Sequence, residues 1–394
     1  MKRVLYFYPH KFADLTDGAH TRVVTMLQYF KSQGFLVDMI SYENAALLSS
    51  YAVENNLVEK IYYADKPAEV KTNWFDRYIK SKFRSARNRL LSKKEKPALL
   101  PNWVNESLIN IFLKLTAEKK YDAILITYAY WAEILNHLNG IDFTGRKVID
   151  TNDFLTLQQF YNHPELDPSQ IGSVFGSEIK QMQQFDDIIH ISYDELLLFS
   201  NFITKARHHY IPQFFYQKPK SYPESYKYDI LFIGSDNPHN VEGINWFLNE
   251  VYPLVDKDFK IALAGNVCRA IPFDYQNILK LGFVEDTAQL FAAARITICP
   301  LLKGSGMKVK VVESLLYGVP VISTSKGLDG FFNRNPAGGI LIANLPAAFA
   351  GHINNILKNE KLLQEQRLQA EEIFNHNFSF AHNAQKLNQV FAAI

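Results

Sequence analysis

The feature that most constrains the fold is an alternation of short apolar runs with amphipathic helical segments. The run "RVLYFYP" (3–9) is followed by the helical segment "TRVVTMLQYFKSQG" (21–34) and then by the run "FLVDMISY" (35–42). A strand, a crossover helix and a second strand in this order build a right-handed unit of a parallel sheet. Further apolar runs bounded by polar residues predict more buried parallel strands at 122–129, 147–151 and 187–192.

The same alternation restarts after residues 211–227, a segment with three prolines and no periodicity that indicates a linker. Beyond it, apolar runs predict strands at 229–235, 260–265, 278–283, 296–302, 319–325 and 338–343, and a helical tail at 345–394. A chain of 394 residues is too long for one ordinary core. We therefore predict an α/β protein with two doubly wound, Rossmann-like domains that face each other across a cleft.

Composition and charge narrow the class of protein. The formal net charge is +2, which does not favour a nucleic-acid-binding polycation. The two cysteines, Cys268 and Cys299, lack paired spacing, so we expect neither a disulfide frame nor a zinc site. The apolar run at the N-terminus is too short for a signal peptide, and we expect a cytoplasmic protein. The first strand is not followed by GxGxxG, which disfavours a nicotinamide cofactor.

The stretch "GSGMKVKVVESLLYGVPVIST" (304–324) carries the strongest chemical signal. We expect a helix to begin near Gly306 or Met307, where free N–H groups favour phosphate. Helical spacing then places Gly306, Lys310 and Glu313 on one face. Amides and a lysine suit a diphosphate, and a carboxylate suits ribose hydroxyls, so the pattern fits a nucleotide diphosphate without a metal. A simple glycine turn with a solvated Lys/Glu pair is the alternative.

Two segments resemble one known family. Residues 282–331 and 229–255 are similar to the donor-binding half of GT-B-fold glycosyltransferases, in the retaining family-four branch with a Gly-Ser-Gly-x-Lys-x-Lys-x-x-Glu signature. The N-terminal half resembles the family only loosely, through "DGAHTR" (17–22), "DTNDF" (150–154) and residues 178–195. The resemblance implies a UDP- or GDP-sugar donor, an active site between the domains, and transfer with retention of configuration and without a metal.

The resemblance also implies roles for residues. By position, Glu313 binds the ribose, and the amides of Gly306 and Met307 bind the diphosphate with Lys308 or Lys310. The implied donor-binding set is Gly18, His20, Gly234, Ser305, Gly306, Met307, Lys308, Lys310 and Glu313. The implied domains are 1–215 for the acceptor, with a basic insertion at 75–97, 216–378 for the donor, and a last helix, 379–394, that crosses back to the first domain.

The sequence departs from the family at two places. Ser305 stands where many relatives have a glutamate that contacts the donor sugar. The loop "GSDNPHNVEG" (234–243) lacks the Arg and Lys that many relatives have there. We therefore expect more of the phosphate charge to fall on Lys308 and Lys310, and the identity of the donor sugar stays open.

Other residues are weaker candidates. Asp153 follows a predicted strand end, where it either acts on the sugar or caps a loop; Asp153 and Lys310 are our candidate catalytic residues. His20 suits phosphate contact or a helix cap, and Arg22 suits phosphate contact or an exposed helix face. His208 and His209 are expected on a strand with opposite orientations, so we do not expect them to bind a metal.

One segment is not explained by a donor site. Residues 77–96 contain nine Lys/Arg with interleaved apolar side chains and one acidic residue, Glu95. Such a pattern suits the anionic surface of the inner membrane face, and equally a solvated loop. RNA binding has no support from any known module.

We therefore expect a retaining glycosyltransferase that uses a glycan, lipid-linked or protein acceptor in surface polysaccharide or glycoconjugate synthesis. Two alternatives remain open from the sequence. One is a sugar-nucleotide epimerase of the same fold, and the other is a catalytically degenerate scaffold protein.

Overall fold

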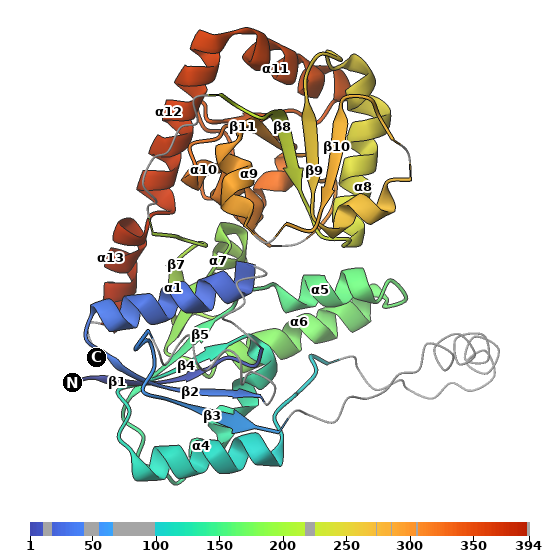
Figure 1. Ribbon diagram of the computed structural model, residues 1–394. Helices are drawn as coiled ribbons and strands as arrows, with labels where there is room; N and C mark the ends of the chain where they lie inside the picture. The colour runs from blue at the N-terminus through green and yellow to red at the C-terminus, as the bar shows by residue number, and fades with distance from the viewer. Residues whose placement is uncertain are drawn as a thin grey trace, which may run out of the picture.

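The computed structural model describes residues 1–10, 18–42, 55–65, 99–216, 225–272, 274–284, 286–304 and 306–391. These residues form two parallel sheets, each covered by helices, that lie one above the other (Figure 1). The predicted architecture of two doubly wound α/β domains is thereby confirmed.

The N-terminal sheet has seven strands in the order β3-β2-β1-β4-β5-β6-β7. All its pairings are parallel. Both faces of the sheet are covered, since Leu5 and Phe7 of β1 enter one core while Val4 and Tyr6 enter the other. The strands are β1 (Arg3–Phe7), β2 (Leu36–Tyr42), β3 (Lys60–Ala64), β4 (Ala123–Thr127), β5 (Arg146–Asp150), β6 (Asp187–His190) and β7 (Arg207–Tyr210).

The helices of this domain begin and end where the local sequence predicts. Helix α6 starts with Pro168 after Asp167, whose side chain forms a capping box with Gln170. Helix α1 is followed by Gly34 at φ +73°, a left-handed stop. The helices are α1 (Gly18–Ser32), α4 (Glu106–Glu118), α5 (Leu155–Asn162), α6 (Pro168–Met182) and α7 (Tyr193–Ser200), with the 3-10 segment η1 (Ala129–Leu138).

The C-terminal sheet has six parallel strands in the order β10-β9-β8-β11-β12-β13. They are β8 (Tyr228–Ile233), β9 (Ile261–Ala264), β10 (Ile278–Gly282), β11 (Ala294–Cys299), β12 (Val321–Ser323) and β13 (Ile340–Ile342). Several are shorter than predicted, because the apolar residues after their carboxyl ends, such as Leu301 after β11, turn into loops at the cleft. The order reverses between β8 and β11, which is where open α/β sheets bind ligands.

Helices cover this second sheet and end the chain. They are α8 (Pro238–Trp246), which continues through η2 (Phe247–Val251) and η3 (Tyr252–Leu254), η4 (Asn266–Ala270), α9 (Thr287–Ala292), α10 (Val309–Leu316), η5 (Ser325–Leu328), α11 (Pro346–Lys358), α12 (Glu360–Asn377) and α13 (Phe380–Phe391). Among the described residues, none of the helices combines the length and the apolarity needed to cross a bilayer.

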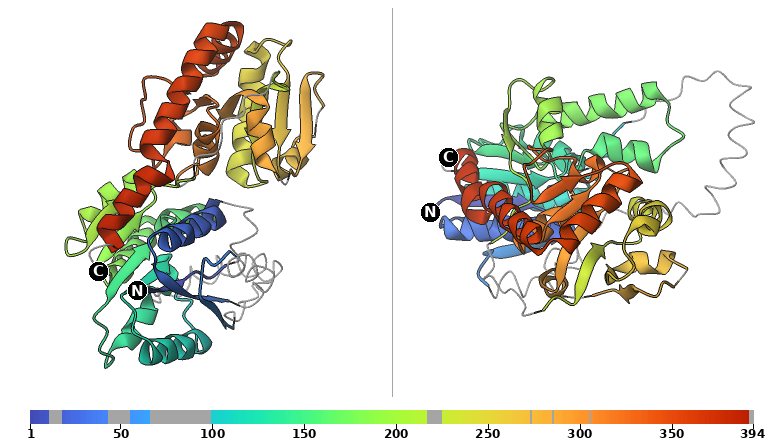
Figure 2. Two further views of the ribbon diagram at one scale, coloured as in Figure 1. Left: turned by 60° about the vertical axis from the view of Figure 1, so that its left-hand side comes forward. Right: turned by 90° about the horizontal axis from the view of Figure 1, so that it is seen from above.

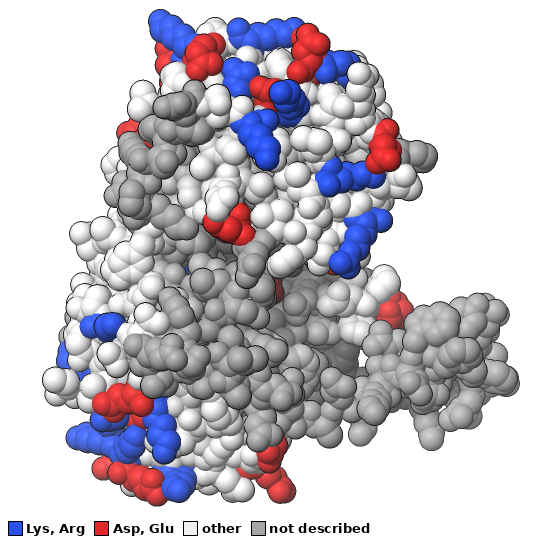
Figure 3. All heavy atoms as spheres, viewed as in Figure 1, with Lys and Arg blue, Asp and Glu red and all other residues white. Residues whose placement is uncertain are grey.

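The last helix lies on the N-terminal domain (Figure 2). Side chains of α13 share a core with α1, and the ring of Phe391 lies 4.9 Å from that of Phe30. Next to α13 the chain pairs with the segment that connects the domains, because Phe215 N donates to Phe378 O and Phe380 N donates to Phe215 O. Two neighbouring crossings therefore join the domains at one side. On the face shown in Figure 3, described basic and acidic side chains are interspersed over the outer ends of both domains.

Candidate active site

A cleft of about 400 Å³ lies between the carboxyl edges of the two sheets, a volume suited to a small-molecule ligand. Among the described residues, its N-terminal wall includes Asp153 after β5 and Gln158, Tyr161 and Asn162 of α5. Its C-terminal wall consists of Asn237, His239, Asn240, Leu301, Lys303, Gly304, Met307, Lys308, Val309 and Lys310. Four of the predicted site residues line this cleft, namely Asp153, Met307, Lys308 and Lys310, and so does Gly304 of the glycine loop.

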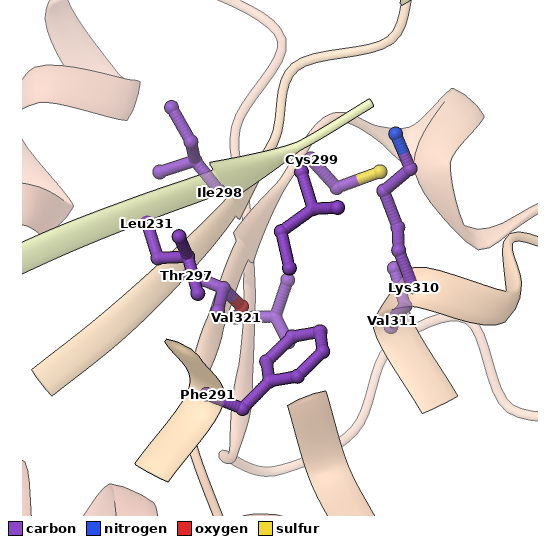
Figure 4. A pocket seen from close by; sticks show the side chains of 9 residues that line it. Leu231, Phe291, Thr297, Ile298, Cys299, Lys310, Val311 and Val321 are labelled. Carbon is purple, nitrogen blue, oxygen red and sulfur yellow. The ribbon is translucent and has the colours of Figure 1, made fainter. Parts of the chain in front are cut away.

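Lys310 lies in the first turn of α10, and its side chain contacts an amide group and an aromatic ring. Its Nζ donates to the side-chain oxygen of Asn240 at 2.8 Å and lies 4.7 Å from the centre of the Phe232 ring. Figure 4 shows its stem beside apolar side chains of the sheet and its nitrogen close to the sulfur of Cys299. Burial, together with the charge of the neighbouring Lys308, lowers the pKa of Lys310 to about 8. An anion that enters the cleft would raise this pKa and favour the ammonium form further.

The glycine loop before α10 differs from the prediction. The helix begins at Val309, not near Gly306 or Met307, because Gly304 and Gly306 have φ of +118° and +68° and cannot continue a right-handed helix. Gly306 is therefore not on the helical face that carries Lys310 and Glu313. Lys308 is the N-cap residue, and its Nζ folds back to donate to Gly306 O at 2.7 Å.

Glu313 follows Lys310 by three residues on α10, so the two side chains share a helical face, as the spacing predicts. Glu313 is half-buried and does not belong to the residues that line the cleft. Its carboxylate is near enough to raise the pKa of Lys310, against the effect of burial. Met307 is buried and packs its side chain into an apolar core, which leaves only its backbone to serve a ligand.

Asp153 lies where the N-terminal domain approaches the glycine loop of the C-terminal domain. One carboxyl oxygen lies 3.4 Å from the position that a Cβ atom on Gly306 would occupy. Burial raises the pKa of Asp153 to about 6, and the positive charge of Lys308 opposes this rise. Asp153 follows Asn152, whose φ of +56° is unusual for a residue other than glycine, and this turn directs the chain toward the cleft.

Two further buried carboxyl groups lie beneath Asp153. Glu178 accepts hydrogen bonds from the backbone N of Leu155 and Thr156 at 3.0 and 2.9 Å, and so caps α5. Burial raises the pKa of Glu178 to about 7, and the charge of Asp153 adds to this rise. Burial also raises the pKa of Glu195, which accepts from Thr151 Oγ1 at 3.2 Å. Neither residue was a candidate from the sequence.

The candidates on α1 are not among the described residues that line this cleft. Gly18 is the first residue of α1, and His20 is buried in its first turn. Neither expectation for Arg22 was right, because this side chain is fully buried and forms a bidentate pair with Asp150. Asp150 is thus structural.

The remaining predictions have mixed outcomes. Gly234 directly follows β8, where a Cβ atom would lie 3.1 Å from the Phe232 ring and 3.2 Å from Asn240, so packing behind Asn240 requires glycine. His208 contacts His190 and His209 contacts Asp187, on opposite faces of β7 as expected. Within the described residues there is no group of three or more His, Cys, Asp or Glu that could hold a metal. Ser305 and the basic segment 77–96, within the insertion 75–97, lie outside the described residues.

Several residues of the cleft were missed by the sequence prediction. His239 and Asn240 lie in the first turn of α8, after the loop that follows β8, and Gln158 and Tyr161 are three residues apart on α5. Polar residues just beyond parallel strands are the signal that could have identified the first two. No comparable local signal exists for α5, because its place opposite α8 depends on the packing of the domains.

Comparison with known proteins agrees with this geometry. Residues 227–359 match the family model described as Glycosyl transferases group 1. An uncharacterized 44.6 kDa protein in the cps region of Klebsiella pneumoniae is 25% identical over 408 residues, which cover 96% of this chain and 95% of that protein.

Two solved structures with low sequence identity share the fold. Sucrose-phosphate synthase from Thermosynechococcus elongatus has a TM-score of 0.70 at 14% identity, with 100% of this chain and 99% of that chain covered. HepE from Anabaena, solved in complex with UDP, has a TM-score of 0.68 at 12% identity, with 100% of both chains covered. The chain therefore has the GT-B fold, and within it residues 227–359 match the glycosyltransferase group 1 model.

Proposed function

We propose that this protein is a retaining glycosyltransferase that moves a sugar from a UDP- or GDP-sugar to a glycan, lipid-linked or protein acceptor in the synthesis of a surface polysaccharide or glycoconjugate. The observation that carries the proposal is the pair Lys308 and Lys310 on one wall of the cleft, with Asp153 on the other. Structures of HepE with UDP and with UDP and glucose show that a protein of this fold holds such ligands.

The two lysines are suited to the leaving diphosphate. Both ammonium groups donate to uncharged oxygen atoms, Lys308 to a backbone carbonyl and Lys310 to an amide. As the bond between the sugar and the diphosphate breaks, negative charge grows on the phosphate oxygens, and positioned cations stabilise that charge. The lysines supply this charge themselves, so the proposed reaction needs no metal ion. Glu313 is proposed to bind the ribose hydroxyls, and the amides of Gly306 and Met307 to bind phosphate.

Asp153 is suited to stabilise the positive charge that develops on the sugar. A sugar that loses its leaving group develops positive charge at the ring, and a carboxylate beside it stabilises that charge. With a pKa of about 6, Asp153 is roughly nine-tenths ionised at pH 7. In the proposed reaction the acceptor oxygen bonds to the sugar on the face that the diphosphate leaves, which retains the configuration, and the acceptor proton goes to the departing phosphate.

A thermal-shift screen tests donor binding. The protein is heated with UDP, GDP, CDP and their common sugar conjugates in the presence of EDTA. We expect one base to raise the melting temperature, because a ligand that binds the folded state stabilises it. Glu313→Ala should abolish the shift, whereas Glu365→Ala, an exposed carboxyl on α12, should leave it unchanged. If no nucleotide shifts the wild-type protein, the proposed function is wrong.

Asp153→Asn separates binding from transfer. We expect the variant to keep the nucleotide-induced shift and to lose about 100-fold or more in the rate of sugar transfer, since it removes a charge needed in the transition state. The rate of transfer is measured through the release of nucleotide diphosphate. A variant that transfers sugar at the wild-type rate would exclude a catalytic role for Asp153.

A further inference from the structure

His239 occupies a place in the cleft that the sequence prediction did not use. It is the second residue of α8, and its ring lies 5.2 Å from that of Tyr161 on α5 of the other domain. Its Cδ2 lies 3.4 Å from the position of a Cβ atom on Gly304, and Lys308 Nζ lies 3.7 Å from the same position. The glycine therefore leaves a small cradle between an imidazole and an ammonium group.

The charges that face His239 are mostly positive. Lys303, Lys308 and Lys326 come from the C-terminal domain, and Glu242 lies one turn further along α8. Glu242 is paired with Lys303 at 2.8 Å, so part of its negative charge is already neutralised. From the N-terminal domain, the ring of Tyr161 contacts His239, and the carboxyl group of Asp153 lines the same cleft.

We propose that His239 is a ligand of the donor diphosphate that binds it as the imidazolium ion, so that the protein takes up one proton from solvent when the nucleotide binds. The inference rests on the proposed function and adds a residue and a proton to it. A neutral imidazole has one N–H donor, whereas the imidazolium ion has two, and a diphosphate offers only acceptors.

The charge balance of the cleft explains why a histidine suits this place. A permanent third cation beside Lys308 and Lys310 would be repelled while the cleft is empty. Burial and the neighbouring lysines hold the pKa of His239 below its ordinary value of 6.5, so it is mostly neutral at pH 7. A bound diphosphate reverses the sign of the local field and favours the charged form. His239 thus provides a cation only when the anion is present.

This linkage has a direct consequence for affinity. Because the bound state holds a proton that the free protein lacks, the nucleotide binds more tightly as the pH falls from about 8 to about 6.5. For one proton the limit is a tenfold change in Kd per pH unit.

Isothermal titration calorimetry with UDP and GDP at pH 7.0, in PIPES, HEPES and Tris, measures the proton directly. The slope of the observed enthalpy against the ionisation enthalpy of the buffer is the number of protons taken up. Because burial lowers the pKa of His239 from its ordinary value, most of the imidazole is neutral at pH 7, and we expect the uptake of most of one proton. Lys310, with a pKa of about 8, contributes only about 0.1 proton at this pH.

Two variants assign the proton to its residue. His239→Gln should reduce the uptake to the small part that Lys310 and Lys308 contribute, since burial lowers the pKa of both, and should weaken nucleotide binding several-fold. His376→Gln, an exposed histidine on α12, should leave both unchanged. If nucleotide binds to the wild type and to His239→Gln with the same proton uptake, this inference alone is overturned. Absence of binding by either nucleotide to the wild type overturns the proposed function and this inference with it.

Discussion

Arg22 of α1 and Asp150 of β5 form an ion pair that is buried completely. Arg22 Nε and Nη2 donate to the two carboxylate oxygens at 2.8 and 2.7 Å. Its Nη1 and Nη2 also donate to the carbonyl oxygens of Pro212 and Ile211, both at 3.0 Å. The guanidinium therefore ties a helix and a strand to the segment that leads out of the N-terminal domain.

Asp150→Asn removes the negative charge and leaves the buried guanidinium with two carbonyl acceptors. Breaking a buried pair from one side costs about 3–5 kcal/mol, because the remaining charge is neither solvated nor compensated. With an m-value of about 3 kcal/mol/M in urea, a loss of about 4 kcal/mol lowers the unfolding midpoint by about 1.3 M. Arg22→Met should cost a similar amount, since it leaves the carboxylate buried without its partner.

The double variant Arg22→Met with Asp150→Leu is the decisive control. It leaves no buried charge, so we expect it to be more stable than either single variant, with a coupling energy of about 2–3 kcal/mol. Urea unfolding followed by circular dichroism and tryptophan fluorescence gives all four midpoints. The reasoning would be refuted if the double variant lost as much unfolding free energy as the two single variants together. It would also be refuted if each single variant lost less than about 1 kcal/mol.

Three further predictions concern the cleft and the junction between the domains. Lys310→Met should weaken nucleotide binding about 10- to 100-fold, since a hydrogen bond from a charged group contributes about 1.5–3 kcal/mol; Lys361→Met, exposed on α12, is the matched control in the same calorimetric titration. Burial raises the pKa of Glu178 from 4.5 to about 7, so the folded protein holds a proton there that the unfolded chain releases. This stabilisation is present below about pH 4.5 and is lost as the pH rises through about 7. Between pH 4.5 and 7.5 the wild-type protein should therefore lose about 3 kcal/mol of stability that Glu178→Gln does not lose. The same pH profile for both proteins in urea unfolding would count against this prediction. Gly330 has a φ of +88°, and a Cβ atom there would lie 3.2 Å from Ser192 Oγ of the other domain, so Gly330→Ala should destabilise the protein by about 1–3 kcal/mol. Gly351→Ala, within α11 and with open space around its Cβ position, should instead stabilise it by about 0.5–1 kcal/mol, and a melting temperature that falls equally for both variants contradicts the argument.

The sequence by itself determined the two sheets and the place of the cleft. Short apolar runs separated by amphipathic segments are local patterns, and a parallel sheet covered on both faces requires such runs. The cleft could be placed because ligands of open α/β sheets bind beyond the carboxyl ends of the strands. Lys308, Lys310 and Asp153 could be selected for the same reason, since each directly follows a predicted strand or the loop after it.

Only the tertiary structure decided which of these side chains meet. Arg22 looked like an exposed helix residue until β5 brought Asp150 against it from 128 positions away. Two left-handed glycines moved the start of α10 to Val309, and the packing of the domains placed His239 of α8 opposite Tyr161 of α5. Periodicity and turn chemistry act over a few residues and can be read locally, whereas ion pairs and the walls of a cleft depend on distances between segments that the chain brings together only when it packs.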